Sequence, residues 1–102
     1  MAVVPDDRQA IAEALVRFSD QKGVEVVLTT GGTGLGPRDV TPETTASVCE
    51  RMAPGLSEIL RSEGYKRSPN AVLSRGVAGL RKSTLIINLP GSLPQGETES
   101  DG

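Results

Sequence analysis

The sequence predicts one domain of the α/β class, because short runs of strand-forming residues alternate with stretches of helical periodicity. The two clearest strand-like runs are residues 24–30 and 83–89, which are rich in Val, Ile, Leu and Thr. A glycine-rich loop, residues 31–36, leads from the first run towards a helix that begins beside Pro42. A chain of 102 residues has room for a single domain with a small core.

Three stretches have the spacing of apolar residues that is typical of helices, namely residues 7–21, 42–52 and 56–64. The first opens at a capping aspartate. Its apolar stripe consists of Ile11, Leu15 and Phe18. Thr41 is the predicted N-cap of the second stretch, and Gly64 is the predicted stop of the third.

The strand pattern leaves a question about the sheet. Residues 24–30 are expected to form a strand buried on both faces. Residues 71–80 fit either a helix or a strand, because their periodicity does not decide between the two. A parallel sheet usually has more than two strands. Either the middle of the chain supplies another strand, or part of the expected sheet is missing.

Composition excludes several classes of function. The formal net charge is −2, from 11 basic and 13 acidic residues, which gives no sequence-wide signal for nucleic acid or for a membrane surface. One Phe, one Tyr and no Trp leave little scope for stacking on bases. Neither a signal peptide nor an apolar run long enough for a membrane span is readable. A soluble cytoplasmic protein, with no nucleic-acid or membrane partner, is therefore expected.

The contents of cysteine and histidine exclude further chemistry. Cys49 is the single cysteine, so an internal disulfide is impossible. The chain has no histidine, which removes the usual zinc ligand and the commonest general base. Zinc sites and His-based triads are therefore not expected.

The glycine-rich loop has the chemistry of a phosphate site. It is neither a P-loop nor a dinucleotide fingerprint, because Gly36 is followed by Pro37 and Arg38. Its glycines would still let backbone approach a phosphate closely. Arg38 offers a fork of donors to a phosphate, and Asp39 offers an oxygen ligand to Mg²⁺. The alternative explanation is a tight turn with a surface Arg–Asp pair.

Three motifs carry a family resemblance. They are residues 29–43 (TTGGTGLGPRDVTPE), residues 73–75 (LSR) and residues 85–92 (LIINLPGS). In this order they resemble the MogA/MoaB family of molybdenum cofactor biosynthesis, which includes the gephyrin G domain. The resemblance runs from about Val3 to Ser92.

The resemblance implies a fold and a reaction. The fold is a three-layer α/β sandwich with a mostly parallel sheet, and the family suggests a homo-oligomer, a trimer. The reaction is that of a molybdopterin adenylyltransferase, which converts MgATP and molybdopterin into adenylyl-molybdopterin and pyrophosphate. Mg²⁺ is then the implied cofactor, and ATP and molybdopterin are the implied substrates.

The resemblance also implies roles for particular residues. Asp39 matches one of two functional aspartates, as a catalytic residue and Mg²⁺ ligand. The implied nucleotide- and phosphate-binding residues are Gly31, Gly32, Thr33, Gly34, Arg38 and Thr41. The implied pterin-binding residues are Ser74, Arg75, Asn88, Pro90 and Gly91.

The chain departs from the family pattern at both ends. The family has a preceding strand and helix that carry its second functional aspartate, and it continues into a final helix. Residues 1–91 are thus expected to form a partial domain without that first strand and last helix, and residues 92–102 an acidic, disordered tail. With one aspartate of the pair, turnover is expected to be slow or absent.

The sequence leaves two alternatives to adenylyl transfer open. One is a non-catalytic module that binds molybdopterin or a nucleotide and contributes to oligomers. The other is the related domain of competence-damage-inducible proteins, which acts on pyridine nucleotides. The residues at 31–34 and 38–39 fit the molybdopterin branch better.

Overall fold

The computed structural model describes residues 3–69 and 74–89 of the chain. The elements are, in chain order, α1 (Arg8–Val16), the π-helical turn η1 (Arg17–Gln21), β1 (Val26–Thr30), α2 (Thr41–Val48), β2 (Arg51–Met52), α3 (Pro54–Arg67), β3 (Ala78–Arg81) and β4 (Thr84–Leu89). Among these described residues, no helix has the length and apolar character that a membrane span requires.

The described strands form one sheet in the order β1-β4-β3-β2. β1 and β4 are parallel, with Val26 opposite Leu85 and Thr30 opposite Leu89. β3 is antiparallel to β4, because a two-residue turn joins them, and β2 is antiparallel to β3. Lys82 in that turn has a left-handed backbone, with φ of 52°. The sheet that the structure describes is therefore mixed, with one parallel pair.

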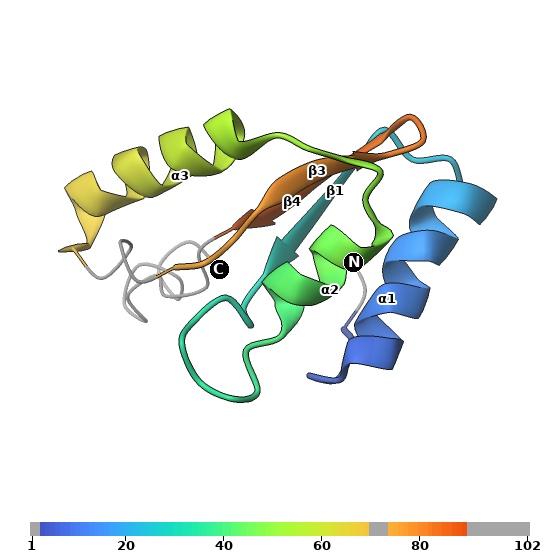
Figure 1. Ribbon diagram of the computed structural model, residues 1–102, viewed down its shortest axis with the longest axis horizontal. Coiled ribbons are helices and arrows are strands. Elements are labelled where there is room, and N and C mark those ends of the chain that lie inside the picture. The colour runs from blue at the N-terminus through green and yellow to red at the C-terminus, as the bar shows by residue number, and fades with distance from the viewer. Residues whose placement is uncertain (1–2, 70–73, 90–102) are drawn as a thin grey trace.

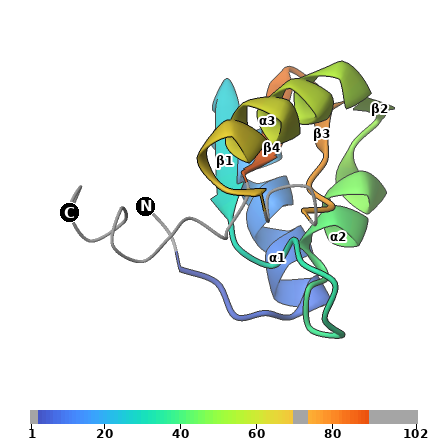
Figure 2. The same ribbon diagram turned by 90° about the vertical axis from the view of Figure 1, so that its left-hand side faces the viewer.

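Helices lie on both faces of this sheet, which gives three layers (Figures 1 and 2). α1 and α2 lie side by side on one face, and α3 lies on the other. The core between α1, α2 and the sheet is centred on Leu15, Val48 and Ile86. The predicted α/β class and three-layer arrangement are confirmed.

The two clear strand predictions are confirmed as β1 and β4, and the ambiguous segment supplies β3. The expectation that the first strand is buried on both faces is wrong for the described structure. Val26 and Leu28 are 52% and 57% exposed. The reason is position, because β1 is the edge strand of the four and its alternate residues face away from α1 and α2.

The predicted ends of two helices are also wrong. α2 ends at Val48 rather than at residue 52, because the backbone at Glu50 and Ala53 donates hydrogen bonds to β3. These tertiary bonds outweigh helical propensity and form β2. α3 continues past Gly64 to Arg67. A glycine inside a helix costs only about 1 kcal/mol, whereas Pro69 forces the residue before it out of the helical region.

The helix starts are closer to prediction. Asp7 caps α1, since its Oδ2 atom accepts a hydrogen bond from the Ala10 N–H at 2.9 Å. Thr41, however, is the first residue of α2, and Val40 occupies the N-cap position without a side-chain bond. The side chain of Thr41 instead faces the glycine-rich loop.

Candidate functional site

In the structure the glycine-rich loop comprises residues 31–40, from the end of β1 to the start of α2 (teal to green in Figure 1). Gly31 and Gly32 have φ angles of 85° and 70°, a conformation that favours glycine. A Cβ atom on Gly32 would lie 2.2 Å from Thr41 Oγ1. The Thr41 N–H donates to the Gly32 carbonyl at 3.1 Å. Thr41 therefore closes the base of the loop, and its side chain leaves no room for one at residue 32.

Asp39 lies inside the loop rather than pointing away from it. Its Oδ2 atom accepts a hydrogen bond from the Gly36 N–H at 2.9 Å, and a Cβ atom on Gly34 would lie 2.8 Å from the same oxygen. The carboxylate is thus held against two glycines, at the N-terminal end of α2. Arg38, the neighbouring cation, is exposed at the rim.

Arg75 connects the loop to a separate segment of the chain. Its N–H donates to the Thr33 carbonyl at 2.8 Å, and its Nε atom donates to the Gly34 carbonyl at 2.7 Å. Its Nη2 atom donates to the Asp39 carbonyl at 2.5 Å, and its Nη1 atom pairs with the carboxylate of Glu43 in α2. The Arg75 side chain therefore contacts the loop at Gly34 and at Asp39, on either side of its tip.

The segment around Arg75 is itself held from two sides. Arg61 of α3 donates from Nη1 to the carbonyls of Ser74 at 3.2 Å and Gly76 at 3.0 Å. Gly76 packs against β4, so that a Cβ atom on it would lie 3.0 Å from the Asn88 carbonyl oxygen. The Ser74 hydroxyl donates to Thr33 Oγ1 at 3.3 Å.

Asn88 lies beneath this arrangement and is 3% exposed. Its Nδ2 atom donates to Thr29 Oγ1 at 2.9 Å and to Thr45 Oγ1 at 3.0 Å. Its Oδ1 atom accepts from the Val77 N–H at 3.1 Å. The side chain of Asn88 thus ties β4 to β1, to α2 and to the entry of β3, and it faces protein on each of these sides.

One ionisation in the site is shifted. The Arg75 guanidinium, by hydrogen bonding, holds the pKa of the Glu43 carboxyl below its usual range, and burial opposes this only weakly. Glu43 therefore stays ionised at neutral pH and keeps its pair with Arg75.

The structure brings most of the predicted site residues together. The loop residues from Gly31 to Thr41 lie beside Ser74 and Arg75, with Asn88 below. Pro90 and Gly91 lie outside the described residues, as does the expected tail at 92–102. Sequence reasoning missed Arg61, for which the sequence carries no signal because its partners are backbone carbonyls. It also missed that Glu43 in α2 pairs with Arg75.

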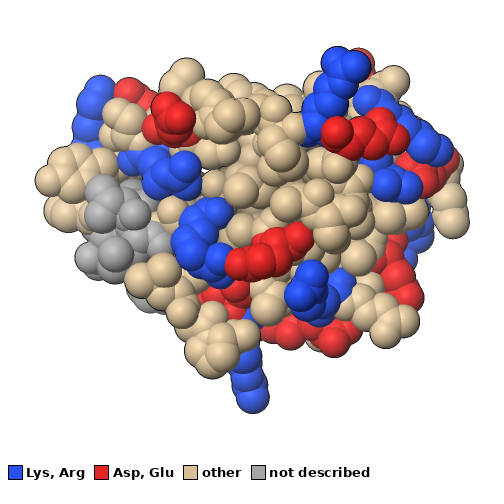
Figure 3. Space-filling model, in the orientation of Figure 1, with Lys and Arg blue, Asp and Glu red and all other residues tan. Residues whose placement is uncertain are grey.

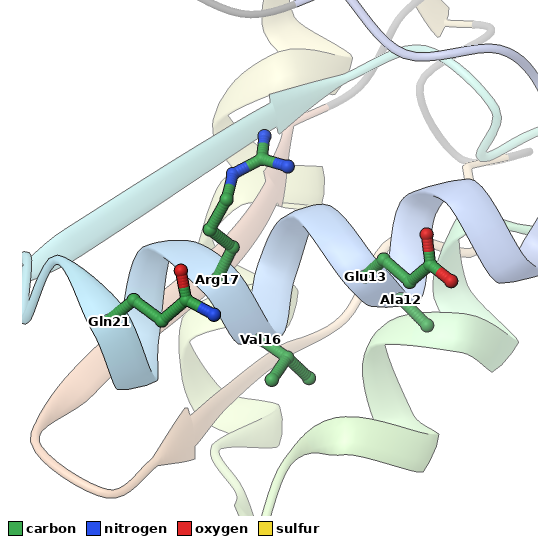
Figure 4. Close-up of a pocket in the computed structure, with 5 residues that line it drawn as sticks. All are labelled: Ala12, Glu13, Val16, Arg17 and Gln21. Carbon is green, nitrogen blue, oxygen red and sulfur yellow. The ribbon is translucent and has the colours of Figure 1, made fainter.

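The surface outside the loop is mixed in charge. Lys and Arg side chains are interspersed with Asp and Glu over the face in Figure 3, so neither sign dominates it. An open hollow of about 410 Å³ lies against α1 and η1 (Figure 4). It is lined by Ala12, Glu13, Val16, Arg17 and Gln21. None of these belongs to the loop, so the hollow is separate from the candidate site.

The sequence model of one protein family, described as a probable molybdopterin binding domain, matches residues 1–97. The chain belongs to this family. The loop, Asp39 and the segment around Arg75 all lie within the residues that this family model matches.

Individual relatives agree with this family. The domain is 47% identical to a molybdopterin adenylyltransferase of Helicobacter pylori over 89 residues, which are 87% of this chain and 51% of that protein. It is also 47% identical over 90 residues to the molybdenum cofactor synthesis protein cinnamon of Drosophila melanogaster, covering 88% of this chain and 15% of that protein. The domain thus spans about half the length of the adenylyltransferase.

A solved structure agrees in fold. The crystal structure of the molybdopterin biosynthesis enzyme MoaB from Thermus thermophilus superposes with a TM-score of 0.80 at 50% identity, covering 93% of this chain and 59% of that one. The prediction of a MogA/MoaB-like domain in molybdenum cofactor biosynthesis is confirmed, and the two alternatives are not favoured.

Mg²⁺, the implied cofactor, requires oxygen ligands in or beside the loop. Among residues 3–69 and 74–89, no group of three acidic, cysteine or histidine side chains is placed to hold a metal. Glu43 is engaged by Arg75, which leaves Asp39 as the carboxylate inside the loop. Mg²⁺ is commonly bound by one or two carboxylates together with substrate phosphates. The residues present therefore fit Mg²⁺ carried in with a phosphate substrate.

Proposed function

We propose that this domain binds the nucleotide and phosphates in a molybdopterin adenylyltransferase, which joins the adenylyl group of MgATP to molybdopterin. One P–O bond forms at the α-phosphorus of ATP, and the bond between the α- and β-phosphates breaks, so that pyrophosphate leaves. The observation that carries the proposal is the closed glycine loop, with Asp39 inside it, in a chain 47% identical to an adenylyltransferase.

The loop supplies positioning and charge rather than covalent chemistry. Backbone N–H groups at residues 31–34 and the N-terminal end of α2 favour negative charge. Arg38, exposed at the rim, binds a phosphate through its planar fork of donors. Asp39 would hold Mg²⁺ together with the phosphates, and the ion would neutralise charge on them.

The remaining predicted residues divide into two groups in this proposal. Ser74, whose hydroxyl bonds Thr33 and the Gly76 N–H, contacts the pterin together with Pro90 and Gly91, which lie outside the described residues. Thr33, Thr41, Arg75 and Asn88 support the loop from behind, because their polar groups face protein. The protein acts in the cytoplasm as a trimer, and residues 1–91 form the domain.

An assay of the whole chain tests turnover. The purified protein is incubated with MgATP and molybdopterin, and adenylyl-molybdopterin is quantified beside the Helicobacter pylori relative. Asp39→Asn is expected to reduce product at least about 100-fold without changing the melting temperature. Asp6→Asn, at an exposed aspartate outside the loop, is the matched control. An unchanged rate for Asp39→Asn would remove Asp39 from the mechanism.

The relatives favour turnover, whereas one feature of the site favours a second candidate, a domain that binds the same ligands without turnover. The observation in its favour is that one loop carboxylate, without a cluster of three in the described residues, is available for metal. Binding of ATP or molybdopterin by calorimetry, with no product, would support this candidate. Product formation would exclude it, and binding of neither ligand would exclude both candidates.

A further inference from the structure

The glycine loop contains few bonds that would hold it in one conformation. Four of the six residues from 31 to 36 are glycines, which lose the most conformational freedom on ordering. The bonds within the loop come from the Asp39 N–H to the Gly36 carbonyl, the Val40 N–H to the Arg38 carbonyl, and the Gly36 N–H to the Asp39 carboxylate. Leu35 at its tip is 69% exposed. A loop of this kind needs contacts from outside to become ordered.

Arg75 provides most of these outside contacts, beside the bonds from Thr41 to Gly32 and from Ser74 to Thr33. Among the described residues, the carbonyls of Thr33, Gly34 and Asp39 each accept a hydrogen bond from Arg75. These three carbonyls lie on both sides of the exposed tip. Arg75 therefore holds the two arms of the loop at a fixed separation.

The guanidinium group is suited to this task and an ammonium group is not. Its Nε, Nη1 and Nη2 atoms reach Gly34, Glu43 and Asp39 at the same time, from one plane. A lysine would place a single charged atom at the end of a flexible chain. Glu43 fixes the rotation of the plane, because its ion pair engages the remaining edge of the guanidinium.

α3 in turn holds the segment that carries Arg75. Arg61 bonds the carbonyls on either side of Arg75, those of Ser74 and Gly76. Gly76 packs closely against the Asn88 backbone, so contact with β4 limits movement of the segment in that direction. The position of the loop is therefore linked to α3 through two arginines in series.

We propose that Arg75 is a positioning residue for the phosphate site, which holds the glycine loop in the conformation that places Asp39 and the start of α2 towards ATP. Its Nε and Nη2 atoms donate to backbone carbonyls of the loop. The consequence for ATP rests on the proposed function, whereas the ordering of the loop can be measured without any ligand.

Hydrogen exchange of the full chain tests the ordering. In Arg75→Lys the backbone amides of residues 33–43 are expected to exchange about tenfold faster, while those of β1 and β4 keep their rates. Arg81→Lys is the matched control, because Arg81 also bonds a carbonyl and a carboxylate but lies away from the loop. Unchanged exchange at residues 33–43 in Arg75→Lys would overturn the proposal. Should that variant not fold, Glu43→Gln removes one of the contacts and is expected to loosen the loop less.

ATP binding and chemical rescue test the positioning. Arg75→Lys is expected to weaken ATP about tenfold, equivalent to about 1.4 kcal/mol. Methylguanidinium at millimolar concentration is expected to restore much of the affinity of Arg75→Ala and to slow its loop exchange. A faster-exchanging loop with unchanged ATP affinity would overturn the positioning role. If the wild-type chain binds no ATP, the proposed function fails, and the exchange experiment alone decides whether Arg75 orders the loop.

Discussion

Two arginines at different places in the fold make similar bonds with different consequences. Arg75 and Arg81 each bond backbone carbonyl oxygen and pair with a carboxylate. Arg81 joins regular elements, because its Nη1 atom donates to the Val48 carbonyl at the end of α2 and its fork binds both oxygens of Asp20 in η1. Arg75 instead joins a glycine loop to a connecting segment.

The partners of the two arginines differ in exposure. The side chains of Arg81 and Asp20 are both 22% exposed, whereas those of Arg75 and Glu43 are 33% and 48% exposed. The hydrogen bond from Arg81 lowers the pKa of Asp20, and partial burial opposes that shift. We infer from this difference that Arg81 stabilises the whole fold, whereas Arg75 fixes a local conformation.

The largest effect is expected from Gly32→Ala. The substitution combines a left-handed backbone with a contact of 2.2 Å to Thr41 Oγ1, so the base of the loop must open. We expect a loss of about 3 kcal/mol in the free energy of unfolding, measured by chemical denaturation. ATP binding should be lost with it.

Gly23→Ala is the matched substitution for the same measurement. Gly23 also has a left-handed backbone, with φ of 60°, but nothing lies within 4 Å of a Cβ atom built there. We expect a loss of about 1 kcal/mol and normal ATP binding. Equal losses in the two variants would show that backbone conformation, and not the contact with Thr41, decides the effect.

A global effect is expected from Arg81→Ala. It removes the bonds to Asp20 and to the Val48 carbonyl, so the melting temperature should fall by roughly 5 °C in calorimetry. Exchange in the loop should rise only in proportion to that in the sheet. A selective rise at residues 33–43 would contradict the division between the two arginines.

The smallest effect is expected from lowering the pH. Because Arg75 depresses the pKa of Glu43, their pair contributes fully above about pH 4, near the value of an unfolded glutamate, and is lost as pH falls through the lower folded value. Loop exchange, corrected for its intrinsic pH dependence, should rise about two- to threefold over that range. Glu43→Gln should exchange at a raised rate throughout and show no such acid step.

Much of the fold could be predicted from local sequence, and two of the errors have the same cause, the pairing of the strands. The spacing of apolar residues predicted α1, and β-branched composition predicted β1 and β4. β2 was missed because residues 51–52 become a strand only when β3 is beside them. The exposed face of β1 was missed because the order of strands, and not composition, places β1 at the edge of the described sheet.

By itself the sequence determined the family, the glycine loop and the candidate role of Asp39, because these depend on residue types at fixed spacing. The tertiary structure decided which of the predicted residues support the loop. Arg75, Thr41 and Asn88 are predicted to contact ligands, and only the structure shows their partners in the protein, which are carbonyls, an amide N–H and hydroxyls. The partners of Arg75 in the loop are Thr33, Gly34 and Asp39, which are 36 to 42 residues away in the chain. They accept through backbone carbonyls, which every residue type has, so their sequence does not reveal the contact.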